Sequence, residues 1–359
     1  MAYNGGNKYY ADTFTKSACE GTGDFAESLS NPVISKISKA EGCQKGSQYL
    51  NVWMYVIHEM EEAIEDCLES VSPSTHWDES VAFYTGSRTL LNPTTTAGLG
   101  VFQYGLAEKK CPLFKTCVLT GDDTLLYKSA ANQKVFELFS EGSNYLKAGQ
   151  CANLATVKEA IVKQMTVPLM QGVMQYLYLS KTTTDLEKLE KAKAELWSFA
   201  SSLLPLISKY NPSVAKTLYN NAYIKNAVTV PDGYQTVKAS LESVYGDIGI
   251  TCTDVGGWID STTSNYASGM EPCVDSSTSS VASSSTSDSK TNMSASAPIA
   301  IALIIIVLLL CLVLVLALGF CFRDKLPKSC NGRDSSPCIP KGDEGSKQLF
   351  DSHTNTNQV

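Results

Sequence analysis

The sequence is poor in the residues on which many enzymes and nucleic-acid-binding proteins depend. It contains three histidines in 359 residues, and only one of its three arginines precedes residue 298. The net charge of −7 argues against a nucleic-acid partner, because such binding needs a basic surface. The chain also has no G-x-S-x-G sequence, no nucleotide-binding glycine loop and no H-E-x-x-H sequence. We therefore expect a protein that is not an enzyme.

Cysteine pairs at C-x-x-C spacing are missing from the first 297 residues, which argues against a zinc ribbon. Eight cysteines are spread through this region, an even number that predicts a disulfide framework and an oxidising compartment. The eight disulfide candidates are Cys19, Cys43, Cys67, Cys111, Cys117, Cys151, Cys252 and Cys273. As neighbours in sequence, Cys111 and Cys117 are expected to pair, and so are Cys252 and Cys273.

Charge is absent from residues 298–322, "PIAIALIIIVLLLCLVLVLALGFCF". A bilayer-spanning helix needs roughly 20 apolar residues, so this segment predicts a single transmembrane helix. Arg323 and two lysines follow within six residues, while Lys290 is the only basic residue in the preceding 20. This asymmetry places a short disordered tail, 323–359, in the cytosol and predicts a type I plasma-membrane protein. The first residues, "MAYNGGNKYYADTF", show no apolar core of a signal peptide.

Residues 276–297 consist almost entirely of Ser, Thr and Ala and cannot bury a core. We expect them to form an extended, O-glycosylated stalk, with an N-glycosylation sequon at Asn292. The predicted organisation is thus an extracellular or periplasmic ectodomain over residues 1–275, followed by the stalk, the span and the tail.

The ectodomain is expected to be mainly α-helical, with many helices linked by disulfides. Trp53, Met60 and Ile64 recur at helical spacing and should face inward, whereas the alternation typical of strands is scarce. A later amphipathic segment that ends near residue 210 has Thr184 or Asp185 as its N-cap.

Two other patterns bear on the fold. Residues 231–249, "PDGYQTVKASLESVYGDIG", begin with Pro and end with Gly, as helices often do. "GSQYL" at 46 recurs as "GSNYL" at 142, which suggests two duplicated helical halves.

One helix face combines a histidine with acidic residues at i, i+3, i+4 and i+7. These residues are His58, Glu61, Glu62 and Glu65. Carboxylate oxygens with one imidazole suit iron or manganese, so this face is a candidate metal site. The alternative is a solvated acidic face with no ligand.

A second candidate is "HWDESVAFYTGSRTL", residues 76–90. Asp78, Glu79 and Tyr84 offer the carboxylate and phenolate oxygens that hard ferric iron prefers, and His76 precedes them. The alternative is a helix start with Asp78 and Glu79 at the positive end of the helix dipole.

Arg88 is the one arginine before the predicted span. Its planar guanidinium could hold a small planar anion such as carbonate against a metal ion. The alternative is an exposed salt bridge.

Four longer stretches resemble the iron-assimilation proteins of green algae, the low-iron-inducible or high-CO2-inducible periplasmic proteins. They are "WDESVAFYTGS", "LAEKKCPLFKTC", "MTVPLMQGVMQYLY" and "VPDGYQTVKASLESVYGDIGITCTDVG". The resemblance covers roughly residues 40–275 and extends to the phytotransferrins of marine phytoplankton. It implies high-affinity uptake of Fe(III) without catalysis, and a Glu-x-x-Glu iron motif at Glu59, Glu62 and Glu65. It also implies carbonate as the companion anion, which would match Arg88.

The soluble periplasmic members of that group have no anchor, so the stalk, span and tail of this chain point to a surface-held receptor. A ferric reductase, a permease or the endocytic machinery are its expected partners. The alternative function is an adhesion or scaffolding ectodomain without a metal, in which the acidic side chains would be dispersed in space.

Overall fold

The computed structural model describes residues 7–27, 36–70, 74–86, 101–118, 128–260 and 263–275. The chain divides into two units, residues 1–283 and 284–359, and every described residue belongs to the first. The predicted stalk, span and tail lie outside the described residues, as do Arg88 and Asn292. Within the described ranges, no helix is both long enough and apolar enough to cross a bilayer.

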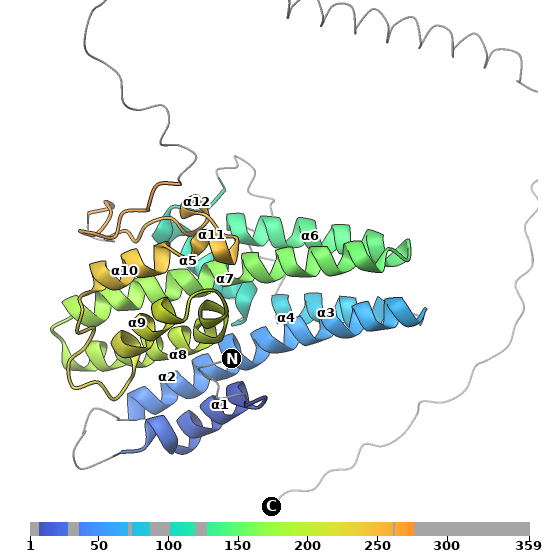
Figure 1. The fold of residues 1–359 in the computed structure, drawn as a ribbon. Helices are drawn as coiled ribbons and strands as arrows, with labels where there is room; N and C mark the ends of the chain where they lie inside the picture. The colour runs from blue at the N-terminus through green and yellow to red at the C-terminus, as the bar shows by residue number, and fades with distance from the viewer. Residues whose placement is uncertain are drawn as a thin grey trace, which may run out of the picture. The chain divides into compact units, whose positions relative to one another are not determined.

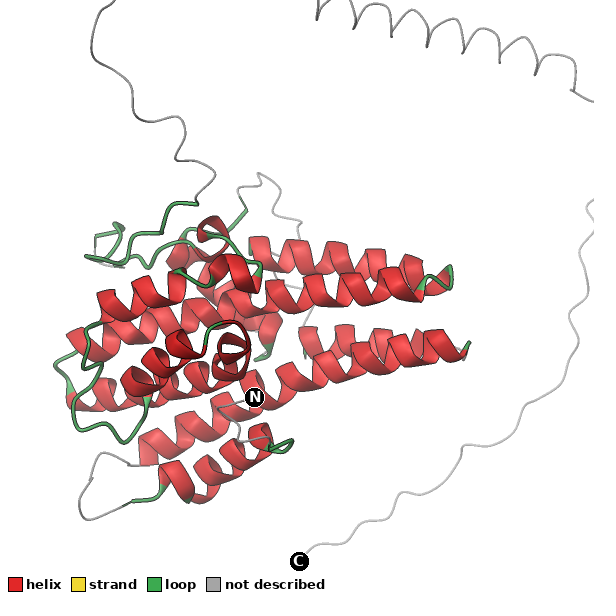
Figure 2. Cartoon of the chain, in the orientation of Figure 1, coloured by secondary structure: helices red, strands yellow, loops and turns green. Residues whose placement is uncertain are grey.

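The described residues are mainly helical, as predicted, and their only β-structure is two isolated bridges (Figure 2). The elements are α1 (Tyr10–Glu20), η1 (Gly23–Phe25), α2 (Lys36–Gly46), η2 (Ser47–Asn51), α3 (Val52–Glu69), α4 (Ser74–Thr85), α5 (Gln103–Phe114), α6 (Ala130–Lys147), α7 (Cys151–Thr182), α8 (Leu186–Tyr210), α9 (Pro212–Ala222), α10 (Tyr234–Glu242), α11 (Tyr245–Ile248) and α12 (Cys252–Val255).

Helix α7 is the longest element, and two groups of helices share it. At one end the pair α6–α7 lies beside the pair α3–α4 (Figure 1), with α3 against α7 and α4 against α6. Beyond this four-helix region, α7 packs on α8, which also contacts α2 and α9. Residues 165–174 of α7 are buried on every face, because neighbouring elements surround this stretch.

Helices α2 and α3 form one continuous rod through η2, a short π-helical stretch. The residues on both sides of η2 keep right-handed helical dihedrals, so the chain does not turn there. Tyr49 and Leu50 of η2 are buried, and the Tyr49 ring stacks on Phe199 of α8 at 5.2 Å between centroids. The π turn therefore directs two large side chains into the core.

Local signals in the sequence set several helix ends. Asp185 caps α8 as predicted, because its carboxylate accepts a hydrogen bond from the Lys188 backbone N–H at 3.0 Å. The segment predicted as one helix over residues 231–249 is instead divided into α10 and α11. The ladder stops at Glu242, and the chain resumes helical geometry at Tyr245.

Four disulfides join the eight predicted cysteines. The pairs Cys111–Cys117 and Cys252–Cys273 are confirmed. Cys19–Cys43 ties α1 to α2. Cys67–Cys151 ties the last turn of α3 to the first residue of α7 across 84 residues of sequence, so it fixes the α3–α4 pair on the α6–α7 pair.

Removal of the long-range bridge should destabilise the fold more than removal of the short one. Loop-closure entropy predicts a loss of about 4.5 kcal/mol for the double variant Cys67→Ser/Cys151→Ser, and about 2 kcal/mol for Cys111→Ser/Cys117→Ser. Urea unfolding of both variants measures the difference. Equal losses would mean that the bridge between α3 and α7 does not restrict the unfolded chain.

Gly142 of α6 allows the close approach of Trp77 from α4. A Cβ atom at this position would lie 2.0 Å from Trp77 Cζ2, so Gly142→Ala should cost about 1–3 kcal/mol of unfolding free energy. Gly246→Ala is the matched control, since a Cβ there meets nothing within 4 Å. Thermal unfolding of the two variants checks this, and a Gly142→Ala variant as stable as its control would contradict the packing of α4 on α6.

Candidate metal site between helices α3 and α4

The inner face of α3 is apolar except for one carboxylate. Trp53 and Met60 are buried, as predicted, and Ile64 is partly buried against the core. Glu59 lies in the same stripe, and its side chain is only 3% exposed. Since a buried carboxylate is costly without partners, its surroundings decide whether the helix tolerates it.

His76, in the first turn of α4, is the main partner of Glu59. Its Nδ1 atom lies 2.9 Å from Glu59 Oε2 and 3.8 Å from Glu79 Oε2, one turn further along α4. Its Nε2 atom lies 3.7 Å from Asp66 Oδ2 on α3. The imidazole thus sits among three carboxylates supplied by both helices, and its side chain is 37% exposed.

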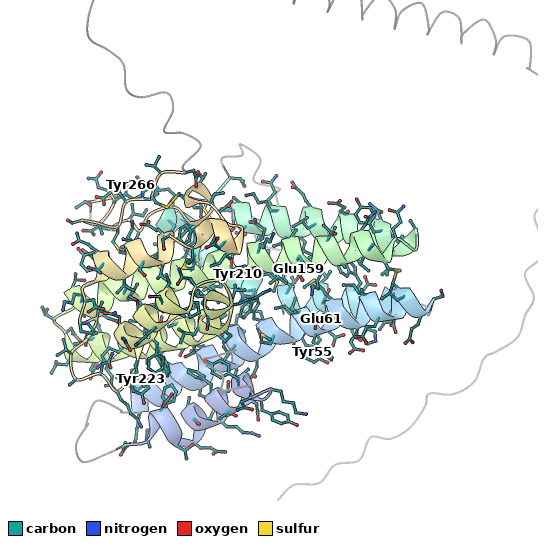
Figure 3. The ribbon with its side chains drawn as sticks, in the orientation of Figure 1. Tyr55, Glu61, Glu159, Tyr210, Tyr223 and Tyr266 are labelled. Carbon is teal, nitrogen blue, oxygen red and sulfur yellow. A yellow bond between two sulfur atoms is a disulfide. The ribbon has the colours of Figure 1, made fainter. Side chains whose placement is uncertain are left out.

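Tyr55 adds a phenol to this cluster. It lies one turn before Glu59 on α3, and the two side chains are hydrogen-bonded, with the phenol as donor. The Tyr55 ring packs edge-on against Phe83 of α4 at 4.6 Å between centroids. Figure 3 shows Tyr55 on the side of α3 away from α7, so the phenol borders the α3–α4 surface.

Glu59, His76 and Glu79 each offer one ligand atom, and these atoms all lie within 4.8 Å of one another. In the part of the chain that the structure describes, this is the one group of three His, Cys, Asp or Glu residues with that geometry. Two carboxylates and one imidazole form a hard, oxygen-rich donor set that suits iron or manganese. The residues present therefore fit a cation of this class.

The electrostatics of the group favour a carboxylate–imidazolium pair when no metal is bound. Burial opposes ionisation of Glu59, but hydrogen bonds with His76, Tyr55 and Glu79 outweigh it and lower the pKa of Glu59. The hydrogen bond with Glu59 raises the pKa of His76 against burial, and the charges of Asp66, Glu59 and Glu79 add to the rise. A cation is thus already favoured at this position, as a proton on His76.

These shifts define a pH window for the pair. The lowered pKa of Glu59 contributes stability above its ordinary value of 4.5, and this contribution is lost as the pH falls through the folded pKa. The raised pKa of His76 contributes stability below its ordinary value of 6.5, which is lost as the pH rises through the folded pKa. Both contributions to stability are therefore fully present between pH 4.5 and pH 6.5, where Glu59 and His76 form an ion pair.

The four residues predicted on the charged face of α3 all lie outside this group. His58 is exposed, with Nδ1 3.7 Å from Glu62 Oε1. Glu61 instead pairs with Lys158 of α7 at 3.1 Å, and Glu65 is exposed. The structure thus spreads these four side chains, and the only close pair among them is His58 and Glu62.

The predicted residues of α4 also separate. Glu79 belongs to the group, whereas Asp78 is exposed. Tyr84 is buried, and its hydroxyl donates to Asn132 Oδ1 at 2.5 Å. Burial, followed by the charge of Glu108, raises the pKa of Tyr84 well above its ordinary value, which disfavours the phenolate that binds ferric iron.

The residue patterns alone do not single out Glu59 and His76 as ligands: Glu59 enters only through the Glu-x-x-Glu motif that the resemblance implies, and His76 only as the residue before Trp77 and Asp78 in the second candidate segment. Glu59 had a usable signal, because it falls between Val56 and Met60 in the apolar stripe of α3, where a carboxylate needs a buried partner. The partner could not be predicted from the stripe, since it comes from another helix.

Substitution of Glu59 should release His76 from its main partner. In Glu59→Gln, the pKa of His76 should fall toward 6.5, because the carboxylate that stabilises the imidazolium is gone. NMR titration of the imidazole protons measures the shift. Glu62→Gln is the control, since its carboxylate contacts His58, and it should leave the His76 titration unchanged. An unaltered pKa in Glu59→Gln would contradict the hydrogen bond.

Comparison with known proteins found no match for this chain among protein-family models, curated proteins or solved structures. The Glu59–His76–Glu79 group is therefore the feature from which a function has to be inferred.

Proposed function

We propose that this protein binds ferric iron outside the cell, at the Glu59–His76–Glu79 group, as a step in iron uptake. The observation that carries this proposal is the buried Glu59 carboxylate, which meets His76 and Glu79 within 4.8 Å at the surface between two helices. On an acidic helix face that contacts only solvent, every carboxylate would be exposed, whereas Glu59 is buried.

The chemistry of the surroundings favours iron over softer metals. The group supplies two carboxylates and one imidazole, with a third carboxylate from Asp66 nearby and no thiol, because the eight cysteines of the described residues are paired in disulfides. Tyr55, already hydrogen-bonded to Glu59, could add a phenolate oxygen. Disulfides also indicate an oxidising compartment, in which ferric iron is the stable oxidation state.

The resemblance to algal iron-assimilation proteins supports the same function and extends it. In this proposal Arg88 holds carbonate as a companion anion, and residues 298–322 anchor the receptor in the plasma membrane. Iron would then pass to a ferric reductase, a permease or the endocytic machinery.

Titration with ferric nitrilotriacetate, with and without bicarbonate, tests the proposal. Wild-type protein should bind Fe(III) saturably, and Glu59→Gln or Glu79→Gln should weaken binding at least about tenfold, because each removes a ligand oxygen. Glu61→Gln and Asp78→Asn are matched controls, since they remove exposed carboxylates outside the group. Circular dichroism confirms that each variant keeps its helices.

The controls separate this site from its alternatives. If Glu61→Gln and Asp78→Asn weaken binding while Glu59→Gln does not, the iron lies on the exposed faces and the assignment to Glu59 is wrong. If wild-type protein shows no saturable binding of Fe(III) with or without bicarbonate, the proposal is wrong. The alternative function, an adhesion or scaffolding ectodomain without a metal, is then favoured.

A further inference from the structure

A second candidate site is separate from the Glu59–His76–Glu79 group. It is a cavity of about 310 Å³ between α1, η1, α8 and the end of α9. This volume falls at the lower end of the range for small-molecule sites. Five aromatic rings line it, contributed by Tyr10, Phe14, Phe25, Trp197 and Tyr219. The cavity therefore has the size and lining of a binding site for a compact ligand.

The rings form walls that meet at steep angles. Phe14 and Phe25 are perpendicular, with centroids 5.4 Å apart. Trp197 and Tyr219 meet at 76° with centroids 5.6 Å apart, and Phe14 lies 6.3 Å from Trp197. Because the face of an aromatic ring carries negative potential, walls of this kind attract a cation with an apolar surface.

Asp24 adds a full negative charge. Among the described residues that line the cavity, it is the only charged one. It accepts a hydrogen bond from the Tyr223 hydroxyl at 3.1 Å. Burial and then the Asp24 charge raise the pKa of Tyr223 to about 12. Burial raises the pKa of Tyr10, and the charge of the Asp24 carboxylate adds to this rise. The negative charge of Asp24 therefore acts on both Tyr10 and Tyr223.

These features together restrict the ligand. An anion would meet both the ring faces and a carboxylate. A small metal ion would find only one carboxylate among the lining residues, and a hydrocarbon would make no use of the charge of Asp24. We propose that the cavity binds a small organic cation with an alkylated ammonium group. The ammonium group packs between the rings near Asp24.

Choline is a suitable probe, because it has this chemistry and a neutral isostere. Isothermal titration of the full-length protein with choline should show saturable binding. The isostere 3,3-dimethylbutan-1-ol has the same shape without the charge, and it should bind at least about tenfold more weakly. Equal affinities would overturn the proposal, as would the absence of saturable choline binding.

Two variants with a matched control locate the site. Asp24→Asn should weaken choline binding about tenfold and leave the neutral alcohol unaffected, because it removes only a charge. Trp197→Phe should weaken choline binding more than binding of the neutral alcohol, because an indole attracts a cation more strongly than a phenyl ring does. Asp12→Asn, which removes an exposed carboxylate of α1 paired with Lys16, should change neither. An Asp24→Asn variant that binds choline like wild type would overturn the assignment.

The cation site is independent of the proposed iron function. Glu59→Gln should leave choline binding unchanged, since Glu59 does not line the cavity. Choline binding in a protein that fails to bind Fe(III) would therefore support this site alone.

Discussion

The described fold depends on the complete burial of residues 165–174 of α7. A helix that is covered on every face needs partners all round, and α5, α8, α10 and α12 contribute to this cover. The sequence of the stretch fits that demand. Gly172 makes room for the Phe199 ring, and Gln171 donates both to the Val255 carbonyl at 2.9 Å and to the Thr116 hydroxyl at 3.1 Å. A polar side chain is thus tolerated at the centre because its donors are used.

The Glu59–His76–Glu79 group lies outside this buried stretch but is held in place by it. The first half of α7, with α6, extends beyond the buried stretch and supports the α3–α4 pair from two sides (Figure 1). On one side is the Cys67–Cys151 bridge between α3 and α7. On the other, the Trp77 indole donates to the Phe139 carbonyl at 3.1 Å. These contacts fix α3 relative to α4, so Glu59 and His76 meet without a large rearrangement, which is what a ligand site needs.

Local patterns in the sequence predict local structure well here, and long-range geometry poorly. The apolar spacing around Trp53 and Met60 gives the inward face of α3, and Asp185 marks the start of α8 because capping is a matter of a few residues. The position of α4 around α3 depends on contacts with α6. These contacts cannot be predicted from the spacing of apolar residues within one helix. Periodicity therefore favours the charged residues opposite the apolar stripe as ligands, whereas the group with ligand-like spacing includes the buried Glu59. The hydrogen bond of Tyr84 cannot be predicted from local pattern either, since its partner Asn132 lies 48 residues away.

The π turn at Ser47–Asn51 has a consequence for how this chain tolerates insertion and deletion. A π turn accommodates one residue more than an α turn, and each residue of an α-helix rotates the following side chains by about 100°. Loss of one residue from η2 would let α2 and α3 join as a regular helix, and the later side chains of α3 would keep nearly their present directions. Glu59 would then stay beside His76, whereas loss of one residue from the regular part of α3 before Glu59 would turn it by about 100°. The π turn thus absorbs one extra residue without changing the phase between the two ends of the rod.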